Sequence, residues 1–182
     1  MTLQQAITLL QNKNINCNTK SVWADLGCGS GLFSYALASI LNEDSIIYAI
    51  DKNISSFKNI SSFKRGFIKL VEFDFEKSTL PFYNLDGILM ANSLHFVKDK
   101  KSFLGKMKNY LTNKSCFLIV EYDTEISNHW VPYPISYLSL KKLFNDAGYT
   151  SVTKINERPS AFNRGNLYSV MIRNESDRAW QI

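Results

Sequence analysis

Two patterns of hydrophobic and polar residues alternate along the chain. Short, almost wholly apolar runs occur in SVWADL (21–26), SIIYAID (45–51) and LDGILMAN (85–92). Between such runs, apolar residues recur every three or four positions, as in GLFSYALASILN (31–42), where the spacing gives one wide apolar face. The first pattern predicts strands buried on both faces, and the second predicts helices that pack against them.

The order of these elements predicts the fold class. We expect strands at 21–26, 45–51, 67–74, 85–92 and 115–123, helices at 2–11, 31–42, 54–64, 101–111 and 139–149, and a closing pair of strands at 149–156 and 167–173. Strands that alternate with helices form a parallel sheet covered on both faces. The sequence therefore predicts an α/β protein.

Length and composition restrict the class further. A length of 182 residues fits a single domain, and we expect it to include an N-terminal helix within residues 1–20 and a loose tail at 174–182. The longest wholly apolar run, Cys116 to Val120, is too short to cross a membrane, and the N-terminus lacks the pattern of a signal peptide. Three cysteines at unrelated spacings argue against a disulfide framework and a metal site, and they favour a reduced, cytoplasmic setting.

The net charge of +5 permits a nucleic-acid partner without requiring one. Lysines concentrate between residues 98 and 114, without interleaved arginine. A solvated helix face explains this concentration better than a nucleic-acid site. A membrane surface is not expected as a partner.

Polar residues and glycines follow the predicted strands. They are Gly27–Gly31, Asp51, Asp74, Asn92–His95 and Tyr122–Asp123. Because ligands of open α/β sheets bind along the carboxyl edge of the strands, these residues form the candidate site.

The glycine-rich stretch ADLGCGSG (24–31) narrows the ligand. It lacks the lysine of a triphosphate-binding loop, and its G-x-G-x-G spacing places Leu32 where a dinucleotide fingerprint needs a third glycine. Asp25 beside the loop would repel a pyrophosphate but suits a cationic ligand. Asp51 is placed to bind a ribose, and Asp74 offers an acceptor for an exocyclic amine such as that of adenine. S-adenosylmethionine carries all of these groups.

The motifs VWADLGCGSG, IIYAID, VEFDFE and LDGILMANSLHFV, in that order, resemble those of the class I S-adenosylmethionine-dependent methyltransferases over roughly residues 20 to 173. The resemblance implies a Rossmann-like, seven-stranded, mostly parallel sheet with helices on both faces and an antiparallel last strand. It also implies that S-adenosylmethionine is the cofactor. The residues expected to bind it are Asp25, Gly27, Cys28, Gly29, Gly31, Asp51, Lys52, Asp74, Phe75 and Asn92.

Several individual roles are implied by the same resemblance. Gly27 and Gly29 would let the backbone approach the methionine part of the cofactor, and Asn92 would lie near it. Asp51 would bind the ribose hydroxyls. Asp74 would meet the adenine amine with Phe75 packed beside the base. A structural alternative stays open for each; for example, Asp74 could be an ordinary loop carboxylate. Cys28 could be a reactive thiol beside a helix N-terminus, but a small buried filler fits this motif better.

Methyl transfer needs a general base only when the acceptor is protonated. His95 is the best-placed candidate and His129 the second, although His95 could equally be a packed histidine that anchors its loop. The strand before Asn92 does not end in the Asn/Asp-Pro-Pro-aromatic tetrapeptide of the amino-methylating subclass, which disfavours that chemistry.

Two predicted insertions, 123–136 and 156–166, would recognise the acceptor. Trp130 and Tyr133 in the first, with Arg158 and Arg164 in the second, predict an aromatic-walled pocket for a small molecule, or else simply pack the loops. An RNA or protein methyltransferase that uses the basic helix at 98–114 remains an alternative. A nicotinamide-dependent oxidoreductase is a more distant one.

Overall fold

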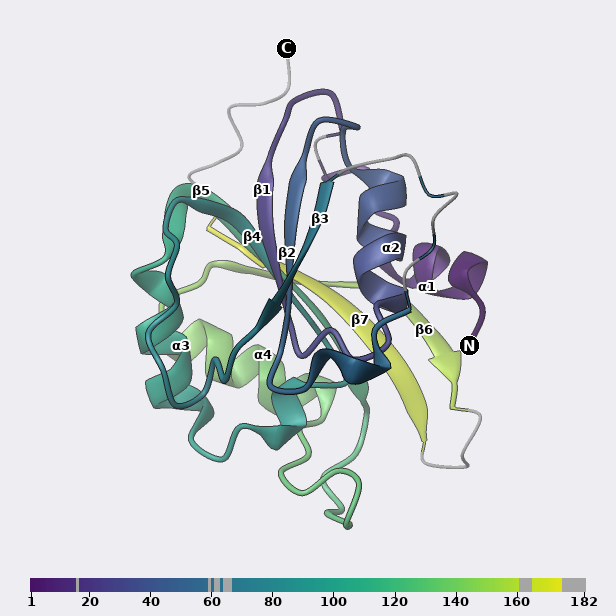
Figure 1. The fold of residues 1–182 in the computed structure, drawn as a ribbon. Helices are drawn as coiled ribbons and strands as arrows, with labels where there is room; N and C mark the ends of the chain where they lie inside the picture. The colour runs from purple at the N-terminus through teal and green to yellow at the C-terminus, as the bar shows by residue number, and fades with distance from the viewer. Residues whose placement is uncertain (16, 59, 61–62, 64–66, 161–164, 175–182) are drawn as a thin grey trace.

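A single seven-stranded sheet runs through the molecule (Figure 1). The computed structural model describes residues 1–15, 17–58, 60, 63, 67–160 and 165–174. The strands stand in the order β3-β2-β1-β4-β5-β7-β6. Their bounds are β1 Val22–Leu26, β2 Ile46–Asp51, β3 Phe67–Glu72, β4 Leu85–Ala91, β5 Leu111–Tyr122, β6 Ser151–Pro159 and β7 Asn166–Arg173.

The strand directions agree with the predicted Rossmann-like arrangement. Strands β1 to β5 pair in parallel, and β7 pairs antiparallel with both β5 and β6. The last strand of the chain is therefore the antiparallel one, as expected.

Helices cover both faces of the sheet (Figure 1). They are α1 Leu3–Leu10, α2 Leu32–Ile40, α3 Lys100–Lys108 and α4 Tyr137–Asp146, with short 3-10 turns η1 Ile54–Ser56 and η2 Leu94–Phe96. Alternate residues of each strand serve opposite faces, so Leu26 and Ile88 join the core beneath α3 and α4, whereas Trp23 and Leu89 join the core beneath α1 and α2.

The N-terminal helix is held at both ends. Thr2 and Gln5 form a reciprocal capping box at its start. Near its end, the Ser169 hydroxyl donates to the Leu9 carbonyl, and the Asn156 amide donates to the Thr8 carbonyl. These bonds tie α1 to the closing strands.

The prediction of a helix at 54–64 is wrong for the residues that the structure describes. Helical structure there is limited to η1, after which the chain turns outward at Phe57. The Asn53 side chain accepts a hydrogen bond from the Ser55 amide and so caps the start of η1, and the helix ends because the backbone is already extended at Phe57. Residues 60 and 63 are not helical, and the rest of 59–66 lies outside the described residues.

Several element ends differ from those expected, and two of these differences concern β5 and β6. Strand β5 begins at Leu111 rather than 115, because Leu111 already pairs with Leu85. Strand β6 continues to Pro159, so the insertion expected at 156–166 shrinks, and Arg158 is a strand residue paired with Leu167. Proline is tolerated at this point because β6 is an edge strand.

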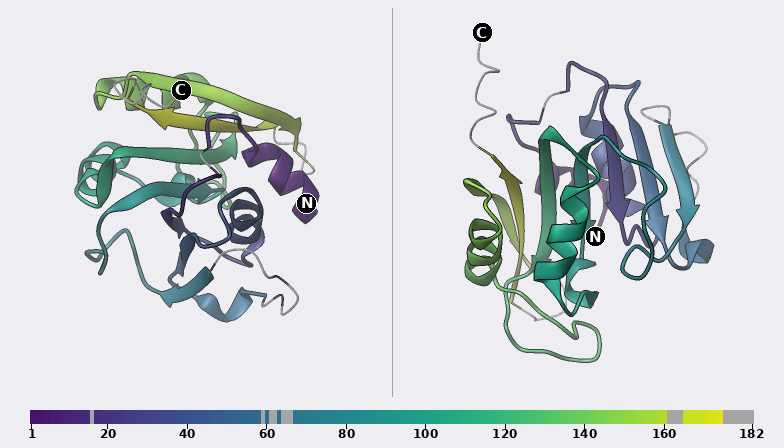
Figure 2. Two further views of the ribbon diagram at one scale, coloured as in Figure 1. Left: turned by 90° about the horizontal axis from the view of Figure 1, so that it is seen from above. Right: turned by 90° about the vertical axis from the view of Figure 1, so that its left-hand side faces the viewer.

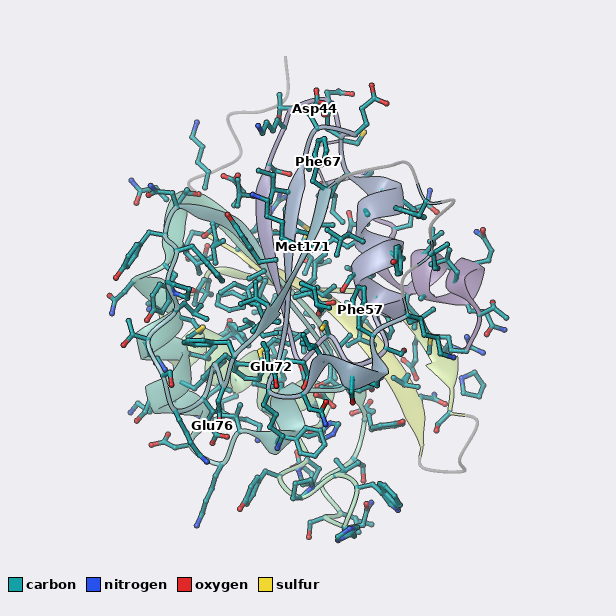
Figure 3. All side chains as sticks on the ribbon, viewed as in Figure 1. Asp44, Phe57, Phe67, Glu72, Glu76 and Met171 are labelled. Atoms are coloured by element: carbon teal, nitrogen blue, oxygen red, sulfur yellow. The ribbon has the colours of Figure 1, made fainter. Side chains whose placement is uncertain are left out.

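The carboxyl ends of the parallel strands meet along one edge. Leu26 is level with Ile50 in the register between β1 and β2, and Asp25 is level with Leu89 between β1 and β4. In Figure 3, Glu72 and Glu76 lie toward this edge, whereas Asp44 and Phe67 lie at the opposite one.

Candidate active site

A cleft with a volume of about 510 Å³ opens at the carboxyl ends of β1, β2, β3 and β4. This size is within the usual range for a small-molecule site. Each of the four strand ends contributes to its wall. The lining residues are Gly27–Ser30, Leu32, Phe33, Asp51, Lys52, Asp74–Lys77, Ala91–Ser93 and Phe96.

The glycine loop, Gly27–Gly31, forms the floor of this cleft in a conformation that side chains would obstruct. Gly27 has a φ of +82°, and a Cβ there would lie 2.5 Å from the Cβ of Ser93. The amides of Gly27 and Cys28 both donate to the Ile50 carbonyl. The loop therefore folds back onto β2, and it shapes the cleft mainly through its close approach to neighbouring backbone.

Asp51 links the loop to the end of β2. One carboxylate oxygen accepts from the Gly29 amide at 3.0 Å, and the other accepts from the Asn53 amide at 3.1 Å. Each oxygen retains a further lone pair, so Asp51 can also accept from a ligand hydroxyl. The neighbouring Lys52 is exposed at the rim of the cleft.

Asp25 lies behind the loop rather than on the cleft wall. Its side chain is 1% exposed, and the Ser34 hydroxyl donates to Oδ2 at 2.5 Å. The other oxygen, Oδ1, is buried without a partner in the described part of the chain. Burial raises the pKa of Asp25 to about 7, against the effect of the Ser34 hydrogen bond and with a contribution from Asp51. Asp25 thus supports the loop from beneath.

Cys28 lines the cleft as a neutral thiol. Burial, followed by the negative charges of Asp25 and Asp51, raises the pKa of Cys28 to about 12. A buried, neutral thiol agrees with a small side chain that fills space in the floor of the cleft and not with a reactive thiolate.

Asp74 and Phe75 form the wall at the end of β3. Oδ1 of Asp74 accepts from the amides of Glu76 and Lys77, which leaves Oδ2 directed to a 3.7 Å ion pair with Lys77. Phe75 packs edge-on against Phe103 of α3. A third residue, Lys106, holds this wall in place: it reaches from α3 and donates to the carbonyls of Phe75, Glu76 and Ser78. This role of Lys106 was not predicted from the sequence.

Asn92 offers an acceptor without a partner inside the cleft. It follows β4 with a φ of +54°, and its amide donates to the Val120 carbonyl. Its Oδ1 is buried and has no hydrogen-bond partner among the described residues. A buried polar atom of this kind needs a donor, which a bound ligand would supply.

His95 stands beside the cleft in a buried pair. Nδ1 of its ring lies 2.7 Å from Oε2 of Glu121, and its backbone amide donates to Oε1 of the same carboxylate. Sequence reasoning missed Glu121, although a lone carboxylate inside the apolar run of β5 was a signal. It also missed Phe96, an exposed aromatic residue on the cleft wall.

Residues 18–169 match the model of a family described as a methyltransferase domain. That match covers most of the chain. The chain belongs to this methyltransferase family.

Solved structures of methyltransferases share its fold. A S-adenosylmethionine-dependent methyltransferase from Aquifex aeolicus is 17% identical, with a TM-score of 0.66 over 94% of this chain and 98% of that one. The 1,6-didemethyltoxoflavin-N1-methyltransferase of Burkholderia thailandensis, solved with its acceptor and S-adenosylhomocysteine, is 17% identical, with a TM-score of 0.66 over 94% of this chain and 77% of that one. A search of curated proteins found no match.

The family membership makes this chain a class I, S-adenosylmethionine-dependent enzyme. The cleft fits that cofactor on its own geometry. Asn92 presents a buried acceptor for a cationic amine, and carboxylates stand at the ends of β2 and β3. Bound S-adenosylmethionine supplies a methyl group on a sulfonium leaving group. The nicotinamide-dependent alternative receives no support.

The 123–136 segment of the methyltransferase extends beyond the carboxyl ends of the strands (Figure 2). Trp130 is 66% exposed, and His129 beside it is exposed as well. Tyr133 is fastened, since its amide donates to the His95 carbonyl and its own carbonyl accepts from Lys100. Neither His129 nor Trp130 lines the cleft.

Of the arginines in the second expected insertion, only Arg158 can be compared with the cleft. Arg158 is half-buried on β6 and is absent from the lining. Arg164 lies outside the described residues.

Three of the lysines between 98 and 114 serve the methyltransferase internally. Lys106 holds the 75–78 turn, and Lys100 donates to the carbonyls of Val97 and Tyr133. Lys108 donates to the Ala147 carbonyl and lies over the ring of Tyr149. The stretch is therefore less available to an external anion than its composition suggests.

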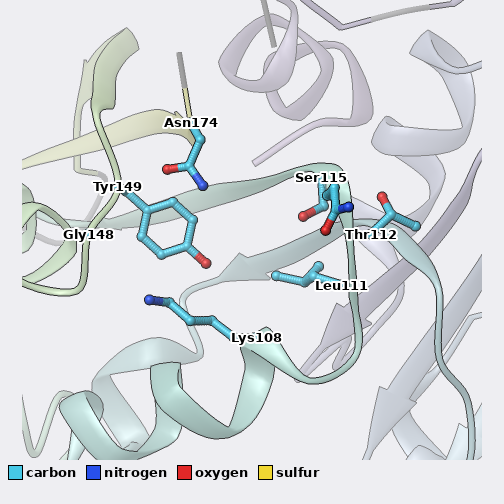
Figure 4. A pocket seen from close by; sticks show the side chains of 8 residues that line it. Lys108, Leu111, Thr112, Ser115, Gly148, Tyr149 and Asn174 are labelled. Carbon is cyan, nitrogen blue, oxygen red and sulfur yellow. The ribbon is translucent and has the colours of Figure 1, made fainter. Parts of the chain in front are cut away.

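A second, polar pocket of about 210 Å³ lies away from the cleft (Figure 4). It is lined by Lys108, Leu111–Asn113, Ser115, Gly148, Tyr149 and Asn174. None of the motif residues reaches it. Among the residues that the structure describes, no helix has the length and apolarity to cross a bilayer.

Proposed function

We propose that the enzyme transfers the methyl group of S-adenosylmethionine to a small molecule bound between the cleft and the 123–136 segment. The observation that carries this proposal is the 52% exposed ring of Phe96 on the cleft wall, directly after the cofactor-side residues Asn92 and Ser93. An exposed aromatic ring inside a cleft favours an apolar ligand surface against it.

We assign the contacts between the cleft residues and the cofactor as follows. Oδ1 of Asn92 accepts from the methionine amine, while Gly27 and Gly29 allow the close approach of that part. Asp51 accepts from the ribose hydroxyls. Oδ2 of Asp74 accepts from the adenine amine, and Phe75 packs beside the base. Gly31, Cys28 and Lys52 complete the surface, and Asp25 acts through the loop.

On the acceptor side, His95 is the proposed general base, whereas the exposure of His129 favours an ordinary loop role. Trp130 and Tyr133 would close over the acceptor, and Arg158, which lies outside the cleft lining, would meet an anionic group that extends beyond the cleft. The Burkholderia thailandensis methyltransferase was solved with bound 1,6-didemethyltoxoflavin, which supports a small-molecule acceptor.

A macromolecular acceptor receives less support. The basic stretch at 98–114 uses the ammonium groups of Lys100, Lys106 and Lys108 for bonds to backbone carbonyls. Fewer cations then remain to contact phosphates than an RNA site requires.

Calorimetry and product analysis test the proposal. We expect S-adenosylmethionine and S-adenosylhomocysteine to bind and NAD not to bind. A metabolite extract incubated with the enzyme and isotopically labelled S-adenosylmethionine should then yield a labelled small molecule by mass spectrometry. Label found only in RNA or protein, or tight RNA binding that weakens steeply with salt, would contradict the small-molecule proposal.

A further inference from the structure

The carboxylate of Glu121 makes two bonds to one residue. Oε1 accepts from the backbone amide of His95 at 3.1 Å, and Oε2 lies 2.7 Å from Nδ1 of its ring. Both side chains are almost fully buried, with 4% of the histidine and 1% of the glutamate exposed. Glu121 comes from the end of β5 and His95 from η2 after β4, so two neighbouring strands fix the pair.

This arrangement determines which ring nitrogen carries the proton. A carboxylate accepts hydrogen bonds, so Nδ1 must donate to it. In the neutral ring the lone pair then resides on Nε2, on the far side of the ring from Glu121. The backbone bond keeps the carboxylate in place, because Oε1 cannot turn toward the ring without losing the His95 amide.

Groups from two further elements, Lys100 of α3 and Tyr168 of β7, lie near this pair. The ammonium of Lys100, from α3, interacts with Glu121 and with Glu125, although burial lowers the pKa of Lys100. On the β7 side, burial raises the pKa of Tyr168, with further contributions from Glu121, Asp123 and Glu125, so its hydroxyl stays protonated. That hydroxyl donates to the Ile135 carbonyl.

His95 is not among the residues that line the cleft, but the adjacent Phe96 is. The rings of His95 and Phe96 are 4.4 Å apart between centroids, and Phe96 forms part of the cleft wall. Ser93 lines the cleft from the other side of the same turn. An acceptor that packs on Phe96 would therefore lie next to the imidazole.

We propose that Glu121 is a positioning residue that holds His95 with Nε2 ready to take a proton, and that the acceptor is a hydroxyl group on an apolar ring, such as a phenol. This inference rests on the proposed function. An arylamine or a thioether is a neutral nucleophile with an available lone pair at neutral pH and does not need such a base, whereas a phenol keeps its proton at neutral pH and is a weak nucleophile until that proton is removed.

The proposed step balances as follows. An oxygen lone pair of the acceptor forms the new C–O bond to the methyl carbon, while the C–S bond breaks and its electrons stay on sulfur as a neutral thioether. The hydroxyl proton moves to Nε2 of His95. The imidazolium that forms is stabilised by the carboxylate of Glu121.

A nuclear magnetic resonance experiment tests the positioning without any acceptor. The chain has two histidines, so ¹⁵N-histidine labelling with S-adenosylhomocysteine bound gives two ring systems, which a His129→Asn variant assigns. We expect His95 as the Nδ1–H tautomer in the wild type. In Glu121→Gln, the amide oxygen stays on the His95 amide and the NH₂ group faces Nδ1, so the ring should shift to Nε2–H. An Nε2–H tautomer in the wild type, or no change in Glu121→Gln, would overturn the proposal.

Methyl transfer to simple acceptors tests the chemistry. Phenol, catechol, the acidic 4-nitrophenol, aniline and thiophenol are each incubated with labelled S-adenosylmethionine. We expect product from the hydroxyl compounds, and a loss of about 100-fold or more in kcat with catechol in Glu121→Gln and His95→Asn, with little change in KM. With 4-nitrophenol, which ionises readily and has little need for a base, the loss should be under about tenfold.

The matched control is Glu43→Gln, an exposed carboxylate at the opposite edge of the sheet, which should match the wild type. Equal losses with both phenols would indicate a merely structural role for the pair. Product from aniline or thiophenol alone, or from none of the compounds, would exclude the phenolic acceptor. Cofactor calorimetry is independent of these results, so a failure here is distinguishable from a failure of the proposed function.

Discussion

The glycine loop, Gly27–Gly31, and the 123–136 segment stand at the same edge of the sheet but are held in different ways. Backbone geometry holds the loop, through positive φ angles and a turn bonded to the Ile50 carbonyl. Side chains hold the segment, since Asp123 and Glu125 accept from groups at and near the start of α4. The loop therefore tolerates few residue types, whereas the segment keeps its position while its exposed residues vary.

Among the variants that test this contrast, we expect Gly27→Ala to lose the most stability. The new Cβ would meet Ser93 at 2.5 Å in a backbone region that disfavours alanine, so we expect a loss of stability on the order of 4 kcal/mol and a much weaker cofactor complex. Urea unfolding and calorimetry measure both. Gly105→Ala on α3, where a Cβ meets nothing within 4 Å, is the control and should stabilise the protein slightly. Similar results for the two variants would refute the backbone constraint.

Asp25→Asn tests the support beneath the loop. Burial raises the pKa of Asp25 from 3.8 to about 7, so the native state binds an extra proton between these pH values and loses stability as pH rises through that window. Asn cannot ionise, so the variant should gain on the order of 3 kcal/mol relative to the wild type above pH 7 and little near pH 4. Thermal unfolding across this range measures the difference. Parallel curves for the two proteins would show that Asp25 is not buried as a neutral acid.

Asp51→Ala removes the bond to Gly29 and the proposed ribose acceptor. We expect S-adenosylmethionine affinity to fall by about 2 kcal/mol, roughly 30-fold, because charged hydrogen bonds are involved. Calorimetry of Asp44→Ala, an exposed carboxylate at the opposite edge in Figure 3, provides the matched control. Unchanged affinity in Asp51→Ala would remove the ribose assignment.

Lys106→Met tests whether a side-chain tether matters on the cofactor side. Losing its bonds to the 75–78 carbonyls should loosen that wall and weaken cofactor binding by about 1 kcal/mol. Lys101→Met, on the exposed face of the same helix, should have no effect. If the two variants bind S-adenosylmethionine equally well, the tether has no part in shaping the cleft.

The smallest effects on folding belong to the 123–136 segment. Trp130→Ala, at an exposed position, should change stability by less than about 0.5 kcal/mol and leave cofactor affinity intact. It should raise KM for the acceptor in the labelling assay, as should Arg158→Ala. Unchanged turnover of the acceptor in both variants would exclude these residues from the acceptor site.

The parts of the fold that the sequence predicted are those with strong local signals. The buried strands β1, β2 and β4 and the glycine loop combine apolar runs with obligatory backbone geometry. Of the helix expected at 54–64 the described residues form only η1, because the backbone is already extended at Phe57 although Asn53 caps the start. Apolar spacing alone could not reveal where that helix ends.

The site was only partly predictable for a related reason. Asp51, Asp74 and Asn92 follow strands, so their meeting at one edge follows from topology. Lys106 and Glu121 act across long sequence separations, on the 75–78 turn and on His95. Although Glu121 stands out in the apolar run of β5, no local pattern identifies the partner of either side chain. The placement of Asp25 behind the loop, rather than in the cleft, likewise depends on the packing of Ser34.

The closure at the base of the 123–136 segment has a consequence for the diversification of this enzyme. Asp123 bonds to the Tyr137 amide, and Glu125 bonds to Ser136 and Ser139, so the two ends of the segment are joined next to each other. The entropic cost of a longer insertion between joined ends rises only slowly with its length. The segment can therefore be replaced by segments of other lengths and sequences while the cofactor site stays the same. Each replacement would then bind a different acceptor.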